Sequence, residues 1–246
     1  MSQIICVIQA RMGSERLPGK VLKPINDIPL LEYQLTRLRR LSNVRIIVAT
    51  SNTAKDDVLA EYCIKHSHEV YRGDEHNVLK RFYDLAMALN LNSCDRIIRL
   101  TGDCPLVCPD LITQLFNTHE GQPDHYLRID TDSFPRGVDA ELFTCEMLTD
   151  AFSNATTEYE HEHVTPYFYQ SGKYSMGKLN NKLGNHSHIR LCVDESADFD
   201  CVTALINEMG DGWPDTDYKD IIAVLSDRPD IANLNQAVEQ KNAHTP

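Results

Sequence analysis

Apolar residues in the first half of the chain alternate between short runs and stripes at helical spacing. The runs predict buried strands over residues 4–8, 44–50, 69–71 and 96–100. The stripes predict helices over residues 30–41, 54–66 and 78–91. Strands that alternate with helices favour a parallel sheet with helices on both faces, and such sheets bind ligands at the carboxyl ends of their strands. The loops 10–20 and 101–107 follow predicted strands at that edge.

The second half of the chain has a less regular pattern. It predicts strands over residues 126–129, 138–143 and 188–193, and helices over residues 147–152, 160–169 and 197–209. From about residue 232 the sequence turns polar and loses its period, so we expect the last residues to be frayed. The pattern favours one α/β domain over residues 1–246, with an inserted subregion at about 124–185.

The composition is that of an ordinary globular protein. Of 246 residues, 42% are hydrophobic and 24% are charged, which excludes a disordered chain. No apolar run reaches the roughly 18–20 residues of a membrane span, and the N-terminus has no basic segment of a secretory signal. We therefore expect a cytoplasmic protein without a membrane partner. The eight cysteines form no Cys-x-x-Cys pair and are expected to be reduced, with Cys6 and Cys192 in the core.

The charge is distributed unevenly along the chain. The formal net charge is −12, from 24 basic and 36 acidic residues. Residues 1–123 hold 15 basic and 14 acidic residues, and residues 124–246 hold the remaining 9 and 22. A half with such an acid excess does not suit a polyanion, so we expect no nucleic-acid partner.

The loop after the first predicted strand carries a concentration of anion-binding groups. Within residues 10–20 stand the cations Arg11, Arg16 and Lys20 together with the hydroxyl of Ser14. Arginine forks and a lysine point charge suit phosphate oxygens, and glycines in the loop let backbone N–H groups approach an anion. The loop therefore predicts a phosphate site at the edge of the sheet.

Two common phosphate-binding motifs are excluded by spacing. A Walker A loop has four residues between its glycines and Ser or Thr after its lysine. Here five residues separate Gly13 from Gly19, and Val21 follows Lys20. A Gly-x-Gly-x-x-Gly dinucleotide fingerprint is also absent from the sequence.

The segment Ala-Arg-Met-Gly-Ser-x-Arg-Leu-Pro-Gly-Lys-Val-Leu resembles the nucleotide-binding loop of the cytidylyltransferases that make CMP-activated sugars, above all their spore-coat-polysaccharide branch. The resemblance extends over residues 3–205. It implies a Rossmann-like fold of the nucleotide-diphospho-sugar transferase type and a loop that holds the phosphates of CTP. The nucleotide-binding residues that it implies are Ala10, Arg11, Gly13, Ser14, Arg16 and Lys20, with Arg72 near the ribose or base.

Aspartates near the same edge are candidate metal ligands. Asp103 follows the strand predicted at 96–100, and one carboxylate beside a phosphate loop is a natural Mg²⁺ ligand. The resemblance implies Asp103 and Asp194 as the two metal ligands. Asp198 is an alternative, although it is explained more simply by the start of a helix. Cys104 stands where the 3-deoxy-octulosonate branch usually has Glu, which argues against that acceptor.

Residues 135–143 and 160–167 resemble family segments near the acceptor pocket and the dimer contact. The acceptor contacts that the resemblance implies are Arg136, Asp139, Glu141 and His163. A zinc site is disfavoured, because no His-Glu-x-x-His motif or cysteine cluster accompanies the histidine pairs. The resemblance also implies a homodimer through the subregion 124–185.

The sequence thus predicts a Mg²⁺-dependent cytidylyltransferase. It would transfer CMP from CTP to a sugar acid or related acceptor, with release of pyrophosphate, in surface polysaccharide or glycan biosynthesis. The predicted catalytic residues are Arg11, Lys20, Asp103 and Asp194. Two alternatives stay open: a metal-dependent glycosyltransferase that uses Asp130 and Asp132, and a non-catalytic nucleotide-binding protein.

Overall fold

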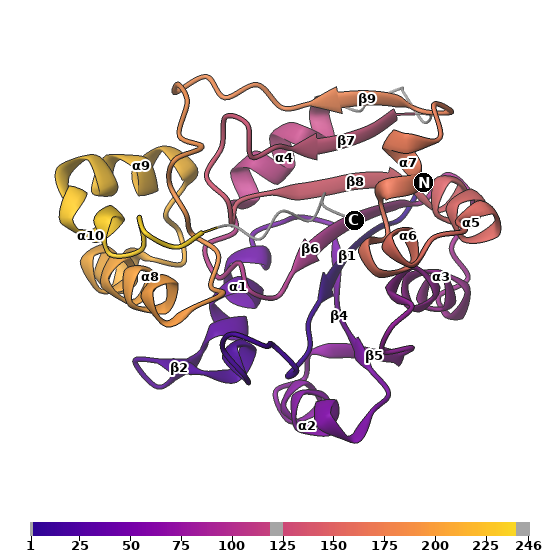
Figure 1. The fold of residues 1–246 in the computed structure, drawn as a ribbon, viewed down its shortest axis with the longest axis horizontal. Helices are drawn as coiled ribbons and strands as arrows, with labels where there is room; N and C mark the ends of the chain where they lie inside the picture. The colour runs from indigo at the N-terminus through magenta and orange to yellow at the C-terminus, as the bar shows by residue number, and fades with distance from the viewer. Residues whose placement is uncertain (1, 119–124, 240–246) are drawn as a thin grey trace.

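The computed structural model describes residues 2–118 and 125–239, and the frayed end predicted for the chain lies largely outside them. Seven strands form one sheet in the order β5-β4-β1-β6-β8-β7-β9 (Figure 1). The strands are β1 (Ile4–Gln9), β4 (Arg45–Ser51), β5 (Glu69–Gly73), β6 (Arg96–Thr101), β7 (His125–Ile129), β8 (Ala140–Thr144) and β9 (Ser175–Lys178). Strand β8 is antiparallel to both neighbours, and the other pairings in this sheet are parallel.

Helices cover both faces of the sheet, as the alternating pattern predicts (Figure 1). One face carries α1 (Leu30–Leu38), α2 (Asp57–Lys65), α4 (Pro109–Thr118), α8 (Ser196–Met209), α9 (Tyr218–Asp227) and α10 (Pro229–Asn233). The other carries α3 (Val78–Ala88), α5 (Cys145–Asn154) and α7 (Pro166–Gln170), with α6 (Glu158–His163) packed against α3. No helix in the described ranges has both the length and the apolar character needed to cross a bilayer.

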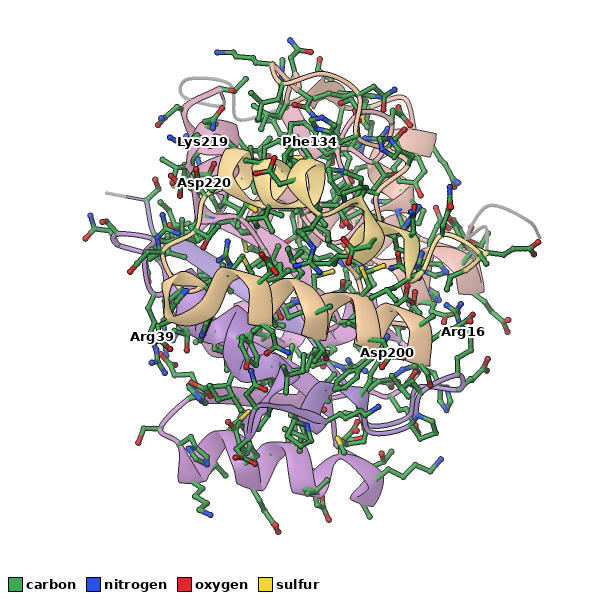
Figure 2. All side chains as sticks on the ribbon, turned by 90° about the vertical axis from the view of Figure 1, so that its left-hand side faces the viewer. Arg16, Arg39, Phe134, Asp200, Lys219 and Asp220 are labelled. Atoms are coloured by element: carbon green, nitrogen blue, oxygen red, sulfur yellow. The ribbon has the colours of Figure 1, made fainter. Side chains whose placement is uncertain are left out.

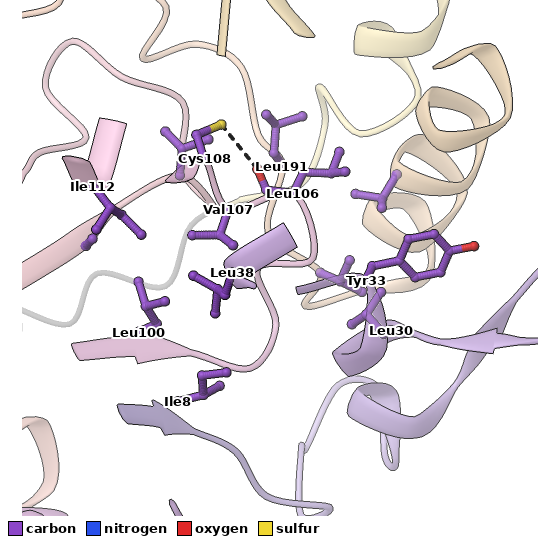
Figure 3. Packing of buried hydrophobic residues seen from close by; sticks show 14 of the residues in the cluster. Ile8, Leu30, Tyr33, Leu38, Leu100, Leu106, Val107, Cys108, Ile112 and Leu191 are labelled. Atoms are coloured by element: carbon purple, nitrogen blue, oxygen red, sulfur yellow. Dashed lines mark hydrogen bonds between the residues drawn. The ribbon is translucent and has the colours of Figure 1, made fainter. Parts of the chain in front are cut away.

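The central strand shows why its sequence is continuously apolar. Ile5 and Val7 of β1 point into the core under α3 and α5, whereas Cys6 and Ile8 point into the core under α1 and α8. A strand buried on both faces has no polar side, so residues 4–8 are all apolar, and the polar Gln9 stands only at the end of the strand. In Figure 3, Ile8 lies near Leu100 of the neighbouring strand β6, and both contribute to the core beneath α1.

The strands predicted over residues 4–8, 44–50, 69–71, 96–100, 126–129 and 138–143 are confirmed, with ends shifted by a few positions. The helices predicted at 30–41, 78–91, 147–152 and 197–209 are also confirmed within similar limits. The helix predicted at 54–66 is divided into a 3-10 helix, η2 (Ala54–Asp56), and α2. The elements that the pattern did not predict are η1 (Lys20–Leu22), β2 (Pro24–Ile25), β3 (Ile28–Pro29), α4, β9, η3 (Gly210–Gly212), α9 and α10.

The helix predicted over residues 160–169 is wrong as one element. The chain forms α6 and α7 there, separated at Val164, whose φ is +71°. Pro166 causes the break, because proline has no N–H to donate and is accommodated at the first position of a new helix. The positive φ of a buried, β-branched valine is uncommon and marks a tightly constrained turn.

The strand predicted over residues 188–193 is also wrong. The segment makes one isolated bridge, between Arg136 and Arg190, and its backbone also bonds to a second loop, at Asp103. Leu191 N donates to Arg136 O at 2.7 Å, and Val193 N donates to Asp103 O at 2.8 Å. The apolar residues of the segment enter the core, and Leu191 lies near Leu106 in Figure 3. Burial therefore explains the apolar run without a strand.

All eight cysteines are free thiols, and only Cys94 is exposed. The prediction that Cys6 and Cys192 are core residues is confirmed, because both are buried. Burial also raises the pKa of the Cys192 thiol well above its usual value, which keeps the thiol protonated and unreactive at neutral pH.

A close approach at Gly137 fixes the course of the segment that leads to Asp194. Gly137 has φ +105°, and a Cβ at this position would lie 2.4 Å from the backbone N of Cys192. Any side chain here would push the 190–193 segment away from the loop that precedes β8.

Gly137→Ala is expected to lower the free energy of unfolding by roughly 2 kcal/mol or more, from backbone strain and the clash together. Chemical denaturation measures this change. Gly212→Ala is the control, because its added Cβ would meet no heavy atom within 4 Å beyond the neighbouring backbone, and it should change stability by less than about 0.5 kcal/mol. Equal responses of the two variants would show that the close approach does not constrain the fold.

Candidate active site

Two loops meet at the carboxyl ends of the adjacent strands β1 and β6. Gly102 N donates to Gln9 O at 2.8 Å, which ties the start of the second loop to the end of β1. A Cβ on Gly102 would lie 2.8 Å from the Cβ of Ala10, so this contact requires a residue without a side chain. The contact brings Asp103, the next residue, beside the loop 10–20.

The loop 10–20 folds back on itself before it enters η1. The backbone N–H groups of Ser14 and Gly19 both donate to Met12 O at 3.0 Å. Gly19 adopts the left-handed conformation, with φ +72°, immediately before η1. This turn places Lys20 at the first position of η1, with its side chain directed inward and its surface only 8% exposed.

The ammonium of Lys20 lies among three oxygen atoms. Its Nζ is 2.8 Å from Asp103 Oδ2, 2.9 Å from Asp194 Oδ1 and 2.7 Å from the backbone oxygen of Val193. We call these three atoms the oxygen cradle. Burial lowers the pKa of Lys20. The charges of Asp103 and Asp194, together with their hydrogen bonds, raise this pKa by more than burial lowers it. The pKa of Lys20 is therefore above its usual value, and the ammonium keeps its charge.

Asp194 is held by two arginines in addition to Lys20. Its Oδ2 lies 3.1 Å from a guanidinium nitrogen of Arg16 and 2.5 Å from one of Arg190. Burial raises the pKa of Asp194, but the charge of Lys20 and those of the two arginines outweigh this effect and lower the pKa below its usual value. Asp194 is therefore ionised at neutral pH.

The start of α8 completes this arrangement. Glu195 and Asp198 form a capping box, and Asp198 accepts hydrogen bonds from the backbone N–H groups of Asp194 and Glu195. The fully buried Asp198 also accepts from Arg190 Nε at 2.8 Å. Asp198 thus begins the helix and anchors Arg190. Figure 2 shows Arg16 beside the end of α8 that carries Asp200, where it binds Glu195 at 2.7 Å.

A cavity of about 350 Å³ opens beside the oxygen cradle. Its lining comes mainly from the two loops and is polar: Gln9, Ala10, Arg11, Gly13, Ser14, Glu15, Arg16, Lys20, Val21, Thr101, Gly102, Asp103, Glu162 and Asp194. A second cavity, also of about 350 Å³, is lined by Arg11, Glu75, His76, Asn77, Glu158, His161 and Glu162. The two cavities share Arg11 and Glu162 in their linings, so they lie next to each other.

The structure brings most predicted nucleotide and metal residues together. The first cavity is lined by every predicted residue of the loop 10–20 and by both predicted metal ligands, Asp103 and Asp194. Arg72 is the exception. Its guanidinium contacts Asp57 at 2.6 Å and the backbone oxygens of Ser51 and Thr53, so it connects β5 to the segment before α2.

The four predicted acceptor residues line neither cavity. Glu141 accepts hydrogen bonds from Arg99, Tyr126 and Thr165, which makes it the centre of a largely buried network. Arg99 in turn donates to Gln9 Oε1 at 3.1 Å, and Gln9 lines the first cavity. The network therefore supports the wall of the site from behind.

The other predicted acceptor residues have local partners. Asp139 accepts from Gly137 N at 2.7 Å, and burial raises the pKa of its carboxyl group. Arg136 bridges to Arg190 through its backbone, and the ring of His163 packs 4.6 Å from the ring of Tyr159.

Some residues of the site were not predicted from the sequence. Val193 contributes a backbone oxygen, which every residue type has, so no sequence signal marks it. Glu162 lines both cavities. Its segment contains other acidic residues, and only its position in α6 distinguishes Glu162 from them, so the sequence did not single it out. Arg190 lies four residues before Asp194, and this spacing to an aspartate was the signal that could have identified it.

The geometry agrees with comparisons against known proteins. The sequence model of a family described as "Cytidylyltransferase" matches residues 5–204. The chain belongs to the cytidylyltransferase family. This cytidylyltransferase is 34% identical over 245 residues to the spore coat polysaccharide biosynthesis protein SpsF of Bacillus subtilis strain 168, covering 96% of this chain and 100% of SpsF.

Solved structures give the same result. A cytidylyltransferase from Leptospira borgpetersenii serovar Hardjo-bovis has a TM-score of 0.87 and 30% identity to this cytidylyltransferase, covering 98% of this chain and 100% of that one. A CMP:2-keto-3-deoxy-manno-octonic acid synthetase complexed with CTP has a TM-score of 0.61 at 16% identity, covering 83% of this chain and 98% of that one, which is a likeness of fold. The predicted fold and the predicted class, a CTP-dependent nucleotidyltransferase, are confirmed.

Because the pKa of Asp194 is lowered, the free energy of unfolding of this cytidylyltransferase should depend on pH in the acid range. A carboxyl group with a folded-state pKa below its unfolded value of 3.8 stabilises the fold above that value, and this stability is lost as the pH falls through the folded-state pKa. We expect the difference in unfolding free energy between the wild type and Asp194→Asn to shrink between about pH 5 and pH 2. Urea denaturation at a series of pH values measures it. A difference that does not depend on pH would contradict the assignment of charge to Asp194.

The variant Glu141→Gln tests whether Glu141 stabilises the fold or contacts an acceptor. Loss of the negative charge leaves the Arg99 guanidinium without its ion pair, and we expect the free energy of unfolding to fall on the order of 3 kcal/mol. Chemical denaturation measures this loss. Glu146→Gln, at an exposed position of α5, is the control and should be nearly neutral. Unchanged stability of Glu141→Gln would return Glu141 to the candidate acceptor residues.

Proposed function

We propose that this cytidylyltransferase transfers CMP from CTP to a sugar-like acceptor and releases pyrophosphate. The observation that carries the proposal is the convergence of the loop cations Arg11, Arg16 and Lys20 with the carboxylates Asp103 and Asp194 on one cavity. Cations suit the triphosphate, and paired carboxylates suit the divalent ion that accompanies it.

In the proposed reaction an oxygen of the acceptor attacks the α-phosphorus of CTP. The new oxygen–phosphorus bond forms as the bond from the α-phosphorus to the α,β-bridging oxygen breaks, and the proton of the acceptor hydroxyl passes to solvent. Such transfers depend mainly on positioning and on stabilisation of charge. Arg11, Arg16 and Lys20 would neutralise the charge that accumulates on the departing pyrophosphate.

The residues present fit Mg²⁺. Asp103 Oδ2 and Asp194 Oδ1 lie within 2.9 Å of the same nitrogen, so the two carboxylates point to one position. Mg²⁺ prefers a few carboxylate oxygens together with phosphate oxygens and water. When bound, the ion would withdraw charge from the phosphate oxygens. Arg16 and Arg190 keep the carboxylate of Asp194 in place for this role.

The second cavity is the proposed binding site of the nucleoside part of CTP. It shares Arg11 with the first cavity and is also lined by Glu75, His76 and Asn77, which follow β5. These side chains offer hydrogen-bond donors and acceptors to a ribose and a base. Arg72 lies on β5 itself but is engaged by Asp57, so a role for it in nucleoside binding would require that ion pair to open.

The wider setting of the reaction is also part of the proposal. The name of SpsF, a spore coat polysaccharide biosynthesis protein, supports a role in surface polysaccharide or glycan biosynthesis. A sugar acid as acceptor, a cytoplasmic location and a homodimer through the subregion 124–185 stay predictions.

The glycosyltransferase alternative gains no support from the geometry. Lys178 Nζ lies 3.0 Å from Asp130 and 2.5 Å from Asp132, so both carboxylates are engaged in an ion pair. Neither aspartate lines the cavity that contains Lys20.

Calorimetric titration with CTP, UTP, ATP and GTP, with and without Mg²⁺, tests the proposal. We expect selective binding of CTP. Because Lys20→Ala removes a charged donor to the triphosphate, it should weaken CTP binding about 10- to 100-fold. Asp103→Ala should remove the part of the binding that depends on Mg²⁺, while Asp132→Ala should leave it intact. Failure to bind any triphosphate, or loss of binding in Asp132→Ala alone, would contradict the proposal.

A further inference from the structure

The Lys20 ammonium fills the oxygen cradle completely. An ammonium has three N–H donors, and the three oxygens of Asp103, Asp194 and Val193 lie 2.7–2.9 Å from Nζ. The whole residue is only 8% exposed, so its charge is balanced by these groups more than by water. The cradle therefore already contains one cation, and that cation belongs to the protein itself.

A divalent metal ion needs the same oxygens. Mg²⁺ binds its ligands at roughly 2.0–2.1 Å, and it would have to enter the position where Nζ now lies. Two cations so close together repel strongly in a partly buried site. Occupation of the cradle by Lys20 and occupation by a metal ion therefore exclude each other.

We infer that Lys20 takes the place of the divalent ion in the nucleotide-free protein and leaves the cradle when triphosphate oxygens accept its ammonium. This inference rests on the proposed function, because it requires a triphosphate in the adjacent cavity. It has two consequences. The metal and the nucleotide bind cooperatively, and the Val193 carbonyl joins Asp103 and Asp194 as a third protein oxygen available to the metal.

The surroundings permit this exchange without collapse of the site. Lysine has a flexible four-carbon stem, and Lys20 lines the cavity into which it would swing. Asp194 keeps its contacts with Arg16 and Arg190 after Lys20 leaves, so the carboxylate stays in place. Backbone contacts hold the other parts, because Val193 N donates to Asp103 O at 2.8 Å.

The experiment measures binding of Mn²⁺ alone to the full chain in the absence of nucleotide, from the electron paramagnetic resonance signal of the free ion. We expect weak binding by the wild type. Lys20→Met keeps the length of the side chain and removes its charge, so it should bind Mn²⁺ at least about tenfold more tightly. The same variant should bind CTP more weakly, so one substitution moves two affinities in opposite directions.

Two controls separate the cradle from a general effect of charge. Lys55→Met removes one positive charge from an exposed position of η2 and should not change Mn²⁺ binding. Adding Asp103→Asn to Lys20→Met should abolish the gain in affinity, because it removes one of the two negative charges of the cradle. Thermal unfolding with and without Mn²⁺ verifies that each variant is folded, and Lys20→Gln replaces Lys20→Met if the latter does not fold.

A further measurement uses the wild type alone. Mn²⁺ should bind much more tightly in the presence of CTP than in its absence. Equal Mn²⁺ affinity of the wild type with and without CTP, or of the wild type and the folded Lys20 variant without CTP, would overturn the inference. Failure of CTP to bind the wild type with Mn²⁺ would instead contradict the proposed function.

Discussion

The three hydrogen bonds of the Lys20 ammonium connect parts of the chain that are far apart in sequence. Lys20 belongs to the loop after β1, Asp103 to the loop after β6, and Asp194 to the segment before α8. Without a cation, two carboxylates and the Val193 carbonyl would face one another in a half-buried space, which is unfavourable. The mutual position of the three segments, and with it the shape of the cavity, therefore depends on a positive charge at this point.

The pattern of apolar positions predicted the first half of the fold well, because β1, β4 and β6 are covered on both faces and their residues face two cores. The pattern gave a wrong prediction where side chains are buried but the backbone is not paired as a strand. Residues 188–193 include apolar positions because Leu191 and Val193 reach the core, yet the backbone of the segment bonds to two different loops. Periodicity reports which side chains are buried, and it does not report where backbone hydrogen bonds go.

The sequence predicted which residues belong to the site better than it predicted which groups their side chains bind. Lys20 and Asp103 follow strands that end at one edge of the sheet, so their proximity follows from topology. The positions of Glu141 and Arg72 were suggested by resemblance, but each binds a neighbour within the fold. A charged side chain at a motif position can reach a substrate or an adjacent partner, and only the three-dimensional arrangement decides between them.

The charge balance of the site gives the physical reason for the coupling that we propose between a metal ion and a nucleotide. The three cations Lys20, Arg16 and Arg190 pair with four carboxylates, those of Asp103, Asp194, Glu195 and Asp198, so these groups carry no excess positive charge to attract a triphosphate. In the proposed exchange, a triphosphate would take cations away from these carboxylates, which would then lose their ionic partners. A divalent ion that entered with the triphosphate would neutralise the charge of those carboxylates and part of the charge of the phosphates. The site that we propose would therefore work by exchange of ionic partners, because neither ligand alone balances the charges that remain.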